Sequence, residues 1–231
     1  TIIALEYALL KAMFHKGVFR GLSDTWKIPM PLGNIIGGGR HAKNSCDIQE
    51  FLLLPEADSF KEAANANRLA HETVGRILNT KRDQESAWTL KAGTDQILEL
   101  LKEGKSQVED KIGVKINLGI DAAANSLYSK RRYNYKNFSK SRKEFNLSIN
   151  EQAEWINSLI KRYKLKYVED AFEENDFNSY SKLNDSALIC GDDLVCTSLD
   201  RLKKAAGKIN AVIVKPNQIG TLSEFFKVVK L

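Results

Sequence analysis

Four charged residues each follow an apolar run, directly or after one glycine: Asp121, Glu169, Asp192 and Lys215. The runs before them, in the same order, are residues 114–120, 167–168, 187–190 and 211–214. Carboxylates are hard oxygen ligands that suit Mg²⁺. A lysine at the end of an apolar run is partly desolvated, which lowers its pKa and lets it act as a base near neutral pH. The four residues therefore predict a magnesium site with a catalytic base.

Each of these residues also has an ordinary structural explanation. A single Asp after a strand is most often a turn former or a helix cap, and Lys215 alone could be a strand-end lysine that extends its ammonium into water. Three carboxylates at successive strand ends weaken this explanation. Asp170 and Asp193, which follow two of them, offer second carboxylates able to orient a ligand or a lysine.

The elements that would bring these residues together are the strands of a parallel barrel, because side chains after the C-terminal ends of its strands share one mouth. Intervals of about 23 to 48 residues leave room for a strand, a turn and a helix between them. We expect strands at 29–36, 48–54, 114–121, 167–169, 187–192 and 210–215. Helices are predicted at 1–13, 59–78, 92–107, 150–163, 176–183, 198–206 and 220–231, with Asn150 as a helix cap. A closed barrel of this type has eight strands, and six are visible.

Composition is that of one large α/β domain. The chain has 231 residues and 43% hydrophobic content, so disorder is not expected. Its cysteines, Cys46, Cys190 and Cys196, form no metal-binding or disulfide pattern, which favours a reducing compartment. The sequence contains no apolar run long enough to span a membrane and no export signal at its start. These features suggest neither export nor a membrane span.

The net charge of +6 is concentrated in one segment, residues 130–143. Its basic residues are Lys130, Arg131, Arg132, Lys136, Lys140, Arg142 and Lys143. We interpret the segment as a solvated hairpin insertion. Aromatic residues interleaved with the charges (Tyr128, Tyr133, Tyr135 and Phe138) leave RNA binding as the alternative.

Two further segments carry polar groups that suit a site. Gly37 to Gly39 form a flexible loop before His41, but no Lys-Ser/Thr pair follows, so a P-loop is not predicted. Gln49 and Glu50 open an apolar strand, which is unusual unless the pair faces a polar cavity.

The sequence resembles the enolase family, whose members dehydrate 2-phosphoglycerate to phosphoenolpyruvate in glycolysis and gluconeogenesis. The motifs that carry the resemblance are residues 31–42, 48–51, 119–121, 168–172, 191–194 and the long run Lys-Pro-Asn-Gln-Ile-Gly-Thr-Leu-Ser-Glu at 215–224. The resemblance implies an enolase-type TIM barrel in the α/β class. With about six of eight barrel strands, the barrel would be incomplete, preceded by the last helix of the N-terminal capping domain.

The resemblance also implies roles for individual residues. Asp121, Glu169 and Asp192 would hold Mg²⁺, and Lys215 would remove the substrate proton, the lysine-and-magnesium scheme known for this superfamily. Glu50 and Glu85 would help expel the substrate hydroxyl as a general acid. His41 and Gln49 would line loops that close over the substrate. A cytoplasmic homodimer that binds a small molecule, with no membrane or nucleic-acid partner, follows from the resemblance too.

The sequence departs from the family pattern at several positions. The acidic loop, normally Gly-Asp-Glu-Gly, aligns with Asp83 to Ser86, where both glycines are replaced and only Glu85 is kept. We expect Asp83 and Ser86 to be strained there. Arg40, Ala171 and Pro216 also differ from the usual residues.

Several parts of the family's site do not occur in the chain. Neither a phosphate-binding Ser-His-Arg-Ser-Gly motif nor a later strand-end lysine occurs before Leu231, and a loop that contributes to a second Mg²⁺ is not recognised. We therefore expect residues 1–26 to be the tail of an N-terminal domain and 27–231 a partial barrel domain. A degenerate, non-catalytic enolase-like binding protein is the main alternative. An enzyme of the same superfamily with another carboxylate substrate is a weaker one.

Overall fold

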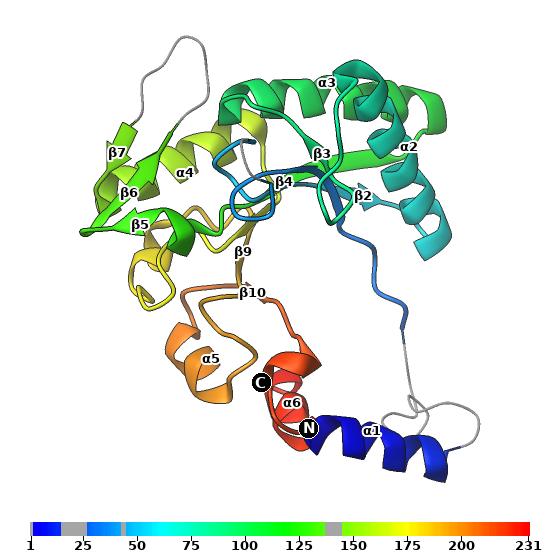
Figure 1. Cartoon of the computed structure of the whole chain (residues 1–231), viewed down its shortest axis with the longest axis vertical. Helices are drawn as coiled ribbons and strands as arrows, with labels where there is room; N and C mark the ends of the chain where they lie inside the picture. Colours follow the sequence, from blue (N-terminus) through cyan, green and yellow to red (C-terminus); the bar gives the residue numbers. More distant parts are fainter. Residues whose placement is uncertain (1, 15–26, 43–44, 137–144) are drawn as a thin grey trace.

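The computed structural model describes residues 2–14, 27–42, 45–136 and 145–231. Its centre is a seven-stranded sheet in the order β10, β9, β8, β4, β2, β1, β3 (Figure 1). The strands are β1 (Gly33–Gly37), β2 (Glu50–Glu56), β3 (Trp88–Thr89), β4 (Lys115–Asp121), β8 (Tyr167–Glu169), β9 (Leu188–Gly191) and β10 (Ala211–Val212). Among the described residues β10 does not pair with β3, so the barrel is open, as predicted.

Strand direction differs from a simple parallel barrel at the first unit. Strands β4, β8, β9 and β10 run parallel, but β2 runs antiparallel to both β1 and β4. The N-terminal end of β2 therefore lies at the same edge of the sheet as the C-terminal end of β4. This arrangement places the start of β2 at the barrel mouth.

Helices cover the outer face of the sheet. They are α2 (Phe60–Leu78), α3 (Thr94–Ile112), α4 (Ile149–Tyr163), α5 (Leu199–Ala205) and α6 (Leu222–Val229). Buried side chains of α2, α3, α4 and α5 join those of the strands in one large core cluster, whereas α6 contacts α5 and its buried residues, Leu222 and Val228, lie outside that cluster. A smaller cluster on the inner side of the barrel is formed by Leu52, Tyr167 and Cys190. These two layers hold the strand ends in place.

Three predicted elements are corrected by the structure. Helix α4 is capped by Ser148, which makes a reciprocal capping box with Glu151, and not by Asn150. The helix predicted at 176–183 is only a short 3₁₀ turn, η3 (Ser179–Lys182). The strand predicted at 210–215 pairs only through Ala211 and Val212.

The segment that follows β4 forms a separate three-stranded sheet of β5 (Tyr128–Ser129), β6 (Arg132–Tyr135) and β7 (Phe145–Leu147). This confirms a hairpin in the basic segment as far as Lys136; the remaining predicted members, including Phe138, Lys140, Arg142 and Lys143, lie outside the described residues. The turn between β5 and β6 places Lys130 and Arg131 at positive φ values of 50° and 61°. Residues other than glycine are uncommon in this conformation.

The first helix, α1 (Ile2–Met13), has no buried residue. It lies beside α6 in Figure 1, and Glu6 accepts a hydrogen bond of 2.7 Å from the backbone N–H of Leu222. Within the described part of the chain, no helix combines the length and apolar character needed to cross a membrane.

Candidate active site

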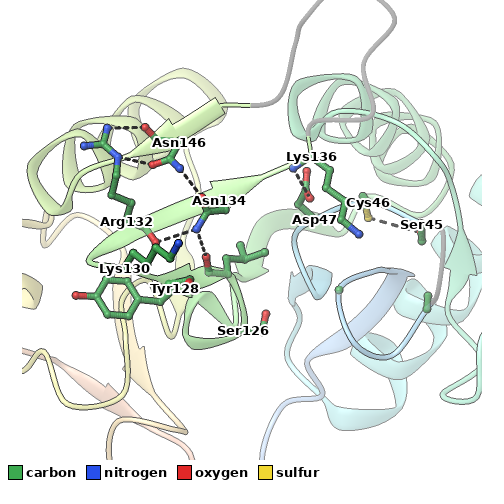
Figure 2. Close-up of a pocket in the computed structure, with 14 residues that line it drawn as sticks. Ser45, Cys46, Asp47, Ser126, Tyr128, Lys130, Arg132, Asn134, Lys136 and Asn146 are labelled. Carbon is green, nitrogen blue, oxygen red and sulfur yellow. Dashed lines mark hydrogen bonds between the residues drawn. The ribbon is translucent and has the colours of Figure 1, made fainter.

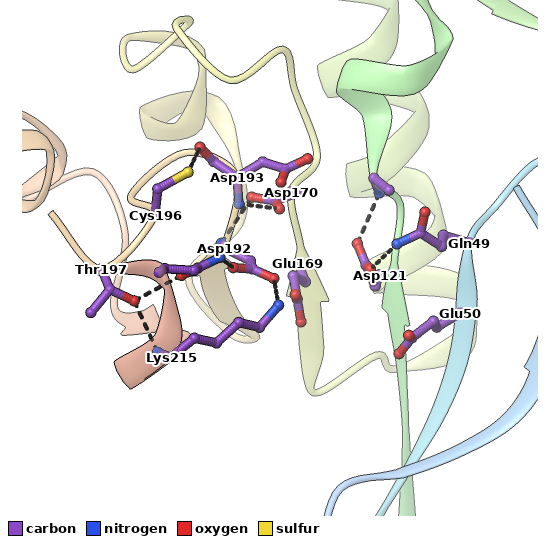
Figure 3. A network of polar contacts seen from close by, with 12 residues as sticks. Gln49, Glu50, Asp121, Glu169, Asp170, Asp192, Asp193, Cys196, Thr197 and Lys215 are labelled. Atoms are coloured by element: carbon purple, nitrogen blue, oxygen red, sulfur yellow. Dashed lines mark hydrogen bonds and ion pairs between the residues drawn. The ribbon is translucent and has the colours of Figure 1, made fainter. Parts of the chain in front are cut away.

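The mouth of the barrel gathers the acidic residues that the sequence singled out (Figure 3). Asp121 ends β4 and Glu169 ends β8, and the two are opposite each other in the parallel β4 and β8 pair. Glu50, the first residue of β2, is opposite Asp121 on its other side. Three neighbouring strands therefore present carboxylates at one edge.

Asp121 is held in place by three hydrogen bonds. One carboxylate oxygen accepts from the backbone N–H of Ala123 at 2.8 Å, and the other accepts from Nε2 of Gln49 at 3.2 Å. The backbone N–H of Gln49 also donates to the Asp121 carbonyl at 3.1 Å. Burial, followed by the charges of Glu169, Asp170 and Glu50, raises the pKa of Asp121 well above its usual value. The site concentrates negative charge in a place with little water.

Glu169 is also buried, and burial raises its pKa to about 7. The hydroxyl of Tyr167 donates a hydrogen bond to Oε2 of Glu169, which opposes part of this rise. Tyr167 fits against β4 because Gly119 has no side chain: a Cβ there would lie 2.9 Å from the Cβ of Tyr167. A hydroxyl donor beside this carboxylate was not predicted from the sequence.

Asp170 has a larger role than the sequence indicated. Its carboxylate accepts hydrogen bonds from the backbone N–H groups of Asp192, Asp193 and Leu194, at 3.0, 2.7 and 3.4 Å. It thereby fixes the turn that follows β9. Burial raises the pKa of Asp170 to about 7, although the backbone N–H groups of Asp193 and Asp192 lower it.

A metal ion could be held by the buried carboxylates. Oxygen atoms of Asp121, Glu169 and Asp170 lie within 4.8 Å of one another, and all three side chains are buried. Neighbouring buried carboxylates repel one another and lose hydration, so a cation among them removes both penalties. The donor set is entirely oxygen, and it fits a divalent cation of the hard type.

Asp192 lies beside this cluster but its carboxylate turns toward the lysine. One oxygen forms an ion pair with Nζ of Lys215, and the other accepts a hydrogen bond of 3.1 Å from Nε2 of Gln218. Its charge contributes to the raised pKa of Glu169. The structure thus brings Asp121 and Glu169 together as predicted and places Asp192 between them and Lys215.

Lys215 is at the predicted position, but the predicted direction of its pKa is wrong. Desolvation lowers the pKa of the ammonium, as the sequence suggested. The hydrogen bond and charge of Asp192, followed by the charges of Glu169 and Asp121, outweigh desolvation and raise the pKa. The surrounding carboxylates could not be weighed against burial from the sequence.

His41, Glu50 and Glu85 form a second group at the mouth. Nδ1 of His41 is 3.1 Å from Oε2 of Glu85 and 4.0 Å from Oε1 of Glu50. Burial, followed by the charges of Glu85 and Glu169, raises the pKa of Glu50 to about 7. Glu50 therefore holds a proton near neutral pH, which is what a general acid needs. These three side chains also have potential metal-ligand atoms within 4.8 Å of one another.

The acidic loop is organised by the residue that replaces its first glycine. Oδ1 of Asp83 accepts from the backbone N–H groups of Glu85 and Ala87, at 2.9 and 3.0 Å. The expected strain is present at Ser86, whose φ is 68°, but is wrong for Asp83, which is not at positive φ. Gly37 allows the loop to approach, since a Cβ there would be 1.9 Å from Oδ2 of Asp83.

The basic hairpin forms one wall of a hollow of about 930 Å³ beside this mouth (Figure 2). Lys130, Arg132 and Lys136 line it, and Arg132 is hydrogen-bonded to Asn146. Tyr133 and Tyr135 are fully buried rather than exposed for base stacking. Two of the four interleaved aromatic residues are therefore not available for stacking on bases, while Tyr128 is partly exposed and Phe138 lies outside the described residues.

Comparison with known proteins gives consistent results. Residues 25–231 match the family model described as "Enolase, C-terminal TIM barrel domain". The chain is 40% identical over 215 residues to a protein named enolase from Archaeoglobus fulgidus, covering 89% of this chain and 52% of the relative. The chain is also 38% identical to a protein named enolase from Natronomonas pharaonis, covering 93% of this chain and 54% of the relative. It is 40% identical to one from Pyrobaculum aerophilum, covering 88% of this chain and 51% of the relative. The chain spans about half the length of these curated relatives.

Proposed function

The chain belongs to the enolase family, and we propose that the protein containing it is a lyase that interconverts 2-phosphoglycerate and phosphoenolpyruvate. The residues of this chain supply the half of that protein's active site that binds the metal and transfers the proton. The observation that carries the proposal is the placement of Lys215 beside the carboxylates of Asp192, Glu169 and Asp121 at one barrel mouth. A degenerate binding protein is not favoured, because the predicted metal ligands and base remain together.

We assign Mg²⁺ as the metal and Asp121, Glu169 and Asp192 as its ligands. All three offer carboxylate oxygens, and the tight cluster includes Asp170, whose own oxygens already accept three backbone hydrogen bonds. Asp170 is therefore the support for the turn and not a ligand in this proposal. When bound, the ion supplies positive charge that offsets the negative charge developing on the substrate carboxylate.

The protein's own groups then divide the proton transfers. Lys215 removes the proton from carbon 2 after its ammonium has lost a proton, and Asp192 holds its Nζ at the mouth. Glu50 donates a proton to the departing hydroxyl at carbon 3; its raised pKa of about 7 keeps that proton available. Glu85 and His41 orient Glu50 from the loop side, and Gln49 holds Asp121.

Family membership also supports a cytoplasmic location and a homodimer in glycolysis and gluconeogenesis, with a small-molecule substrate and without a nucleic-acid or membrane partner.

The test is formation of phosphoenolpyruvate from 2-phosphoglycerate, measured by ultraviolet absorbance, with the natural protein that contains these residues. Product formation should require Mg²⁺ and stop on chelation. Lys215→Ala should lower kcat by at least about 10³-fold, because no other group at the mouth replaces the base. Lys203→Ala, an exposed lysine on α5, is the matched control and should retain full activity. Undiminished turnover in Lys215→Ala would disprove the assignment.

A further inference from the structure

Thr197 occupies an unusual position between β9 and α5. It is completely buried, and its φ of 53° lies in the left-handed region, as does the φ of 47° at Cys196. A β-branched residue rarely adopts this conformation, because its side chain crowds the backbone. Such residues persist where the surrounding structure holds them, and they cluster at functional sites.

The hydroxyl of Thr197 does not cap the helix that follows. Ser198 is the N-cap residue of α5. The Thr197 hydroxyl instead accepts a hydrogen bond of 2.9 Å from the backbone N–H of Lys215 and donates one of 2.8 Å to Oε1 of Gln218. Figure 3 shows the contact between Thr197 and the Lys215 backbone.

These contacts close a ring of polar groups. A hydroxyl has one proton to donate, so Thr197 fixes the amide oxygen of Gln218 toward itself and the amide nitrogen away. That nitrogen donates to Oδ1 of Asp192 at 3.1 Å, and Oδ2 of Asp192 is paired with Nζ of Lys215. One buried hydroxyl thus sets both the backbone of the proposed base and the carboxylate that holds its ammonium.

We propose that Thr197 is a positioning residue for proton transfer, acting through Lys215 directly and through Gln218 on Asp192. The proposal rests on the proposed function, because it takes Lys215 as the base. Loss of the hydroxyl frees the Lys215 backbone and removes the group that orients Gln218. The ammonium then samples positions away from the substrate, and small displacements of a reacting group are costly to rate.

The test compares Thr197→Val, which removes the hydroxyl but keeps the branched shape, with Thr197→Ser, which keeps the hydroxyl. In the natural protein, Thr197→Val should lower kcat by about 10- to 100-fold with KM changed by less than about threefold, since the lost effect is on orientation. Thr197→Ser should stay within about threefold of the unsubstituted protein. Amide hydrogen exchange at Lys215 should be faster in Thr197→Val only.

Thr73→Val is the matched control. Thr73 is also buried and its hydroxyl accepts one hydrogen bond, from Arg76, but it lies on α2 away from the mouth. It should leave kcat and Lys215 exchange unchanged. If Thr197→Val does not fold, Gln218→Met opens the ring from the other side and should give the same kcat loss. Where both fold, the double variant should lose no more than the worse single variant, because both break one network.

Three results would overturn the role of Thr197: an unchanged kcat in Thr197→Val, an unchanged kcat in Gln218→Met, or a loss in Thr197→Ser equal to that in Thr197→Val. The last would mean that packing, and not the hydroxyl, matters. Absence of product in the unsubstituted protein would instead overturn the proposed function, so the two failures are distinguishable.

Discussion

Glu50 and Asp121 lie opposite each other, because β2 and β4 are antiparallel and Glu50 begins β2 where Asp121 ends β4. The pairing places the proposed proton donor next to a proposed metal ligand on the neighbouring strand. It also explains why the charge of Glu50 contributes to the raised pKa of Asp121. Strand pairing thus makes the ionisation of the proposed metal ligand depend on that of the proposed acid.

We predict that Glu50→Gln separates the two steps of the reaction. Without its proton donor, expulsion of the hydroxyl should slow by about 10²- to 10⁴-fold. Removal of the carbon 2 proton by Lys215 should continue. In D₂O, NMR should therefore show deuterium entering 2-phosphoglycerate while phosphoenolpyruvate hardly accumulates. Loss of both exchange and dehydration would assign Glu50 another role. Glu56→Gln, at the far end of β2, is the control and should behave like the unsubstituted protein.

Asp121→Asn should weaken Mg²⁺ binding by at least about tenfold, because an amide replaces one buried anionic ligand while keeping the shape. Isothermal calorimetry measures this without reference to activity. Asp110→Asn, on the exposed side of α3, changes the net charge equally and should leave the affinity alone. Equal weakening in both variants would indicate a general charge effect and contradict ligation by Asp121.

The stability of the chelated protein should fall as pH rises from about 4 to 7. Burial raises the pKa values of Glu169 and Asp170 to about 7 in the folded protein, while unfolded carboxyls titrate near their usual values. The folded state therefore binds more protons in this range, and the stability present below about pH 4 is lost as pH passes the folded values. The change is about 3 kcal/mol for each group and on the order of 6 kcal/mol for the two together.

Thermal unfolding at pH 5.5 and pH 8 with a chelator measures this effect. The Tm should be lower at pH 8, and Mg²⁺ should restore it there because the ion binds only the folded state. A Tm that rises with pH in chelator would show that these carboxylates are not held in a costly environment.

Ser148→Ala should destabilise the protein by about 1 kcal/mol. The hydroxyl of Ser148 accepts the backbone N–H of Glu151 at the start of α4, and alanine cannot replace it. Chemical denaturation gives the free energy of unfolding. Ser158→Ala, an exposed serine in the middle of the same helix, is the control. A cost for Ser158→Ala as large as that for Ser148→Ala would remove capping as the explanation.

The sequence predicted the parts of the site that follow regular strands. Apolar runs located Asp121 and Glu169, which end the buried strands β4 and β8. The same kind of run led to Lys215, although β10 already ends at Val212. The sequence did not reveal the ring of Thr197 and Gln218, since hydrogen bonds between loops have no periodic pattern. The direction of the Lys215 pKa failed for a related reason: burial acts locally, whereas the charges of Asp192, Glu169 and Asp121 arrive from other strands.

Fold prediction likewise succeeded for long periodic elements and failed for short irregular ones. Helix α2 was placed almost to the residue, whereas α3 ends at Ile112, five residues beyond its predicted end. The short turn at η3 was mistaken for a helix. The antiparallel direction of β2 was not predicted, because an alternating or apolar strand looks the same in either direction. The strain predicted at Ser86 is present, but the strain predicted at Asp83 is not. The side chain of Asp83 stabilises the turn by accepting a hydrogen bond from the backbone N–H of Glu85.

The burial of the hairpin tyrosines makes the fluorescence of a neighbouring tryptophan depend on the position of the hairpin. Tyr135 and Phe145 pack against Trp155 of α4, with ring centroids 4.7 and 5.7 Å from the indole. Trp88 instead stacks on His71 near the acidic loop. Emission from Trp155 therefore senses whether the basic hairpin is seated on the barrel, and a red shift on adding a ligand would mark the release of that hairpin into water.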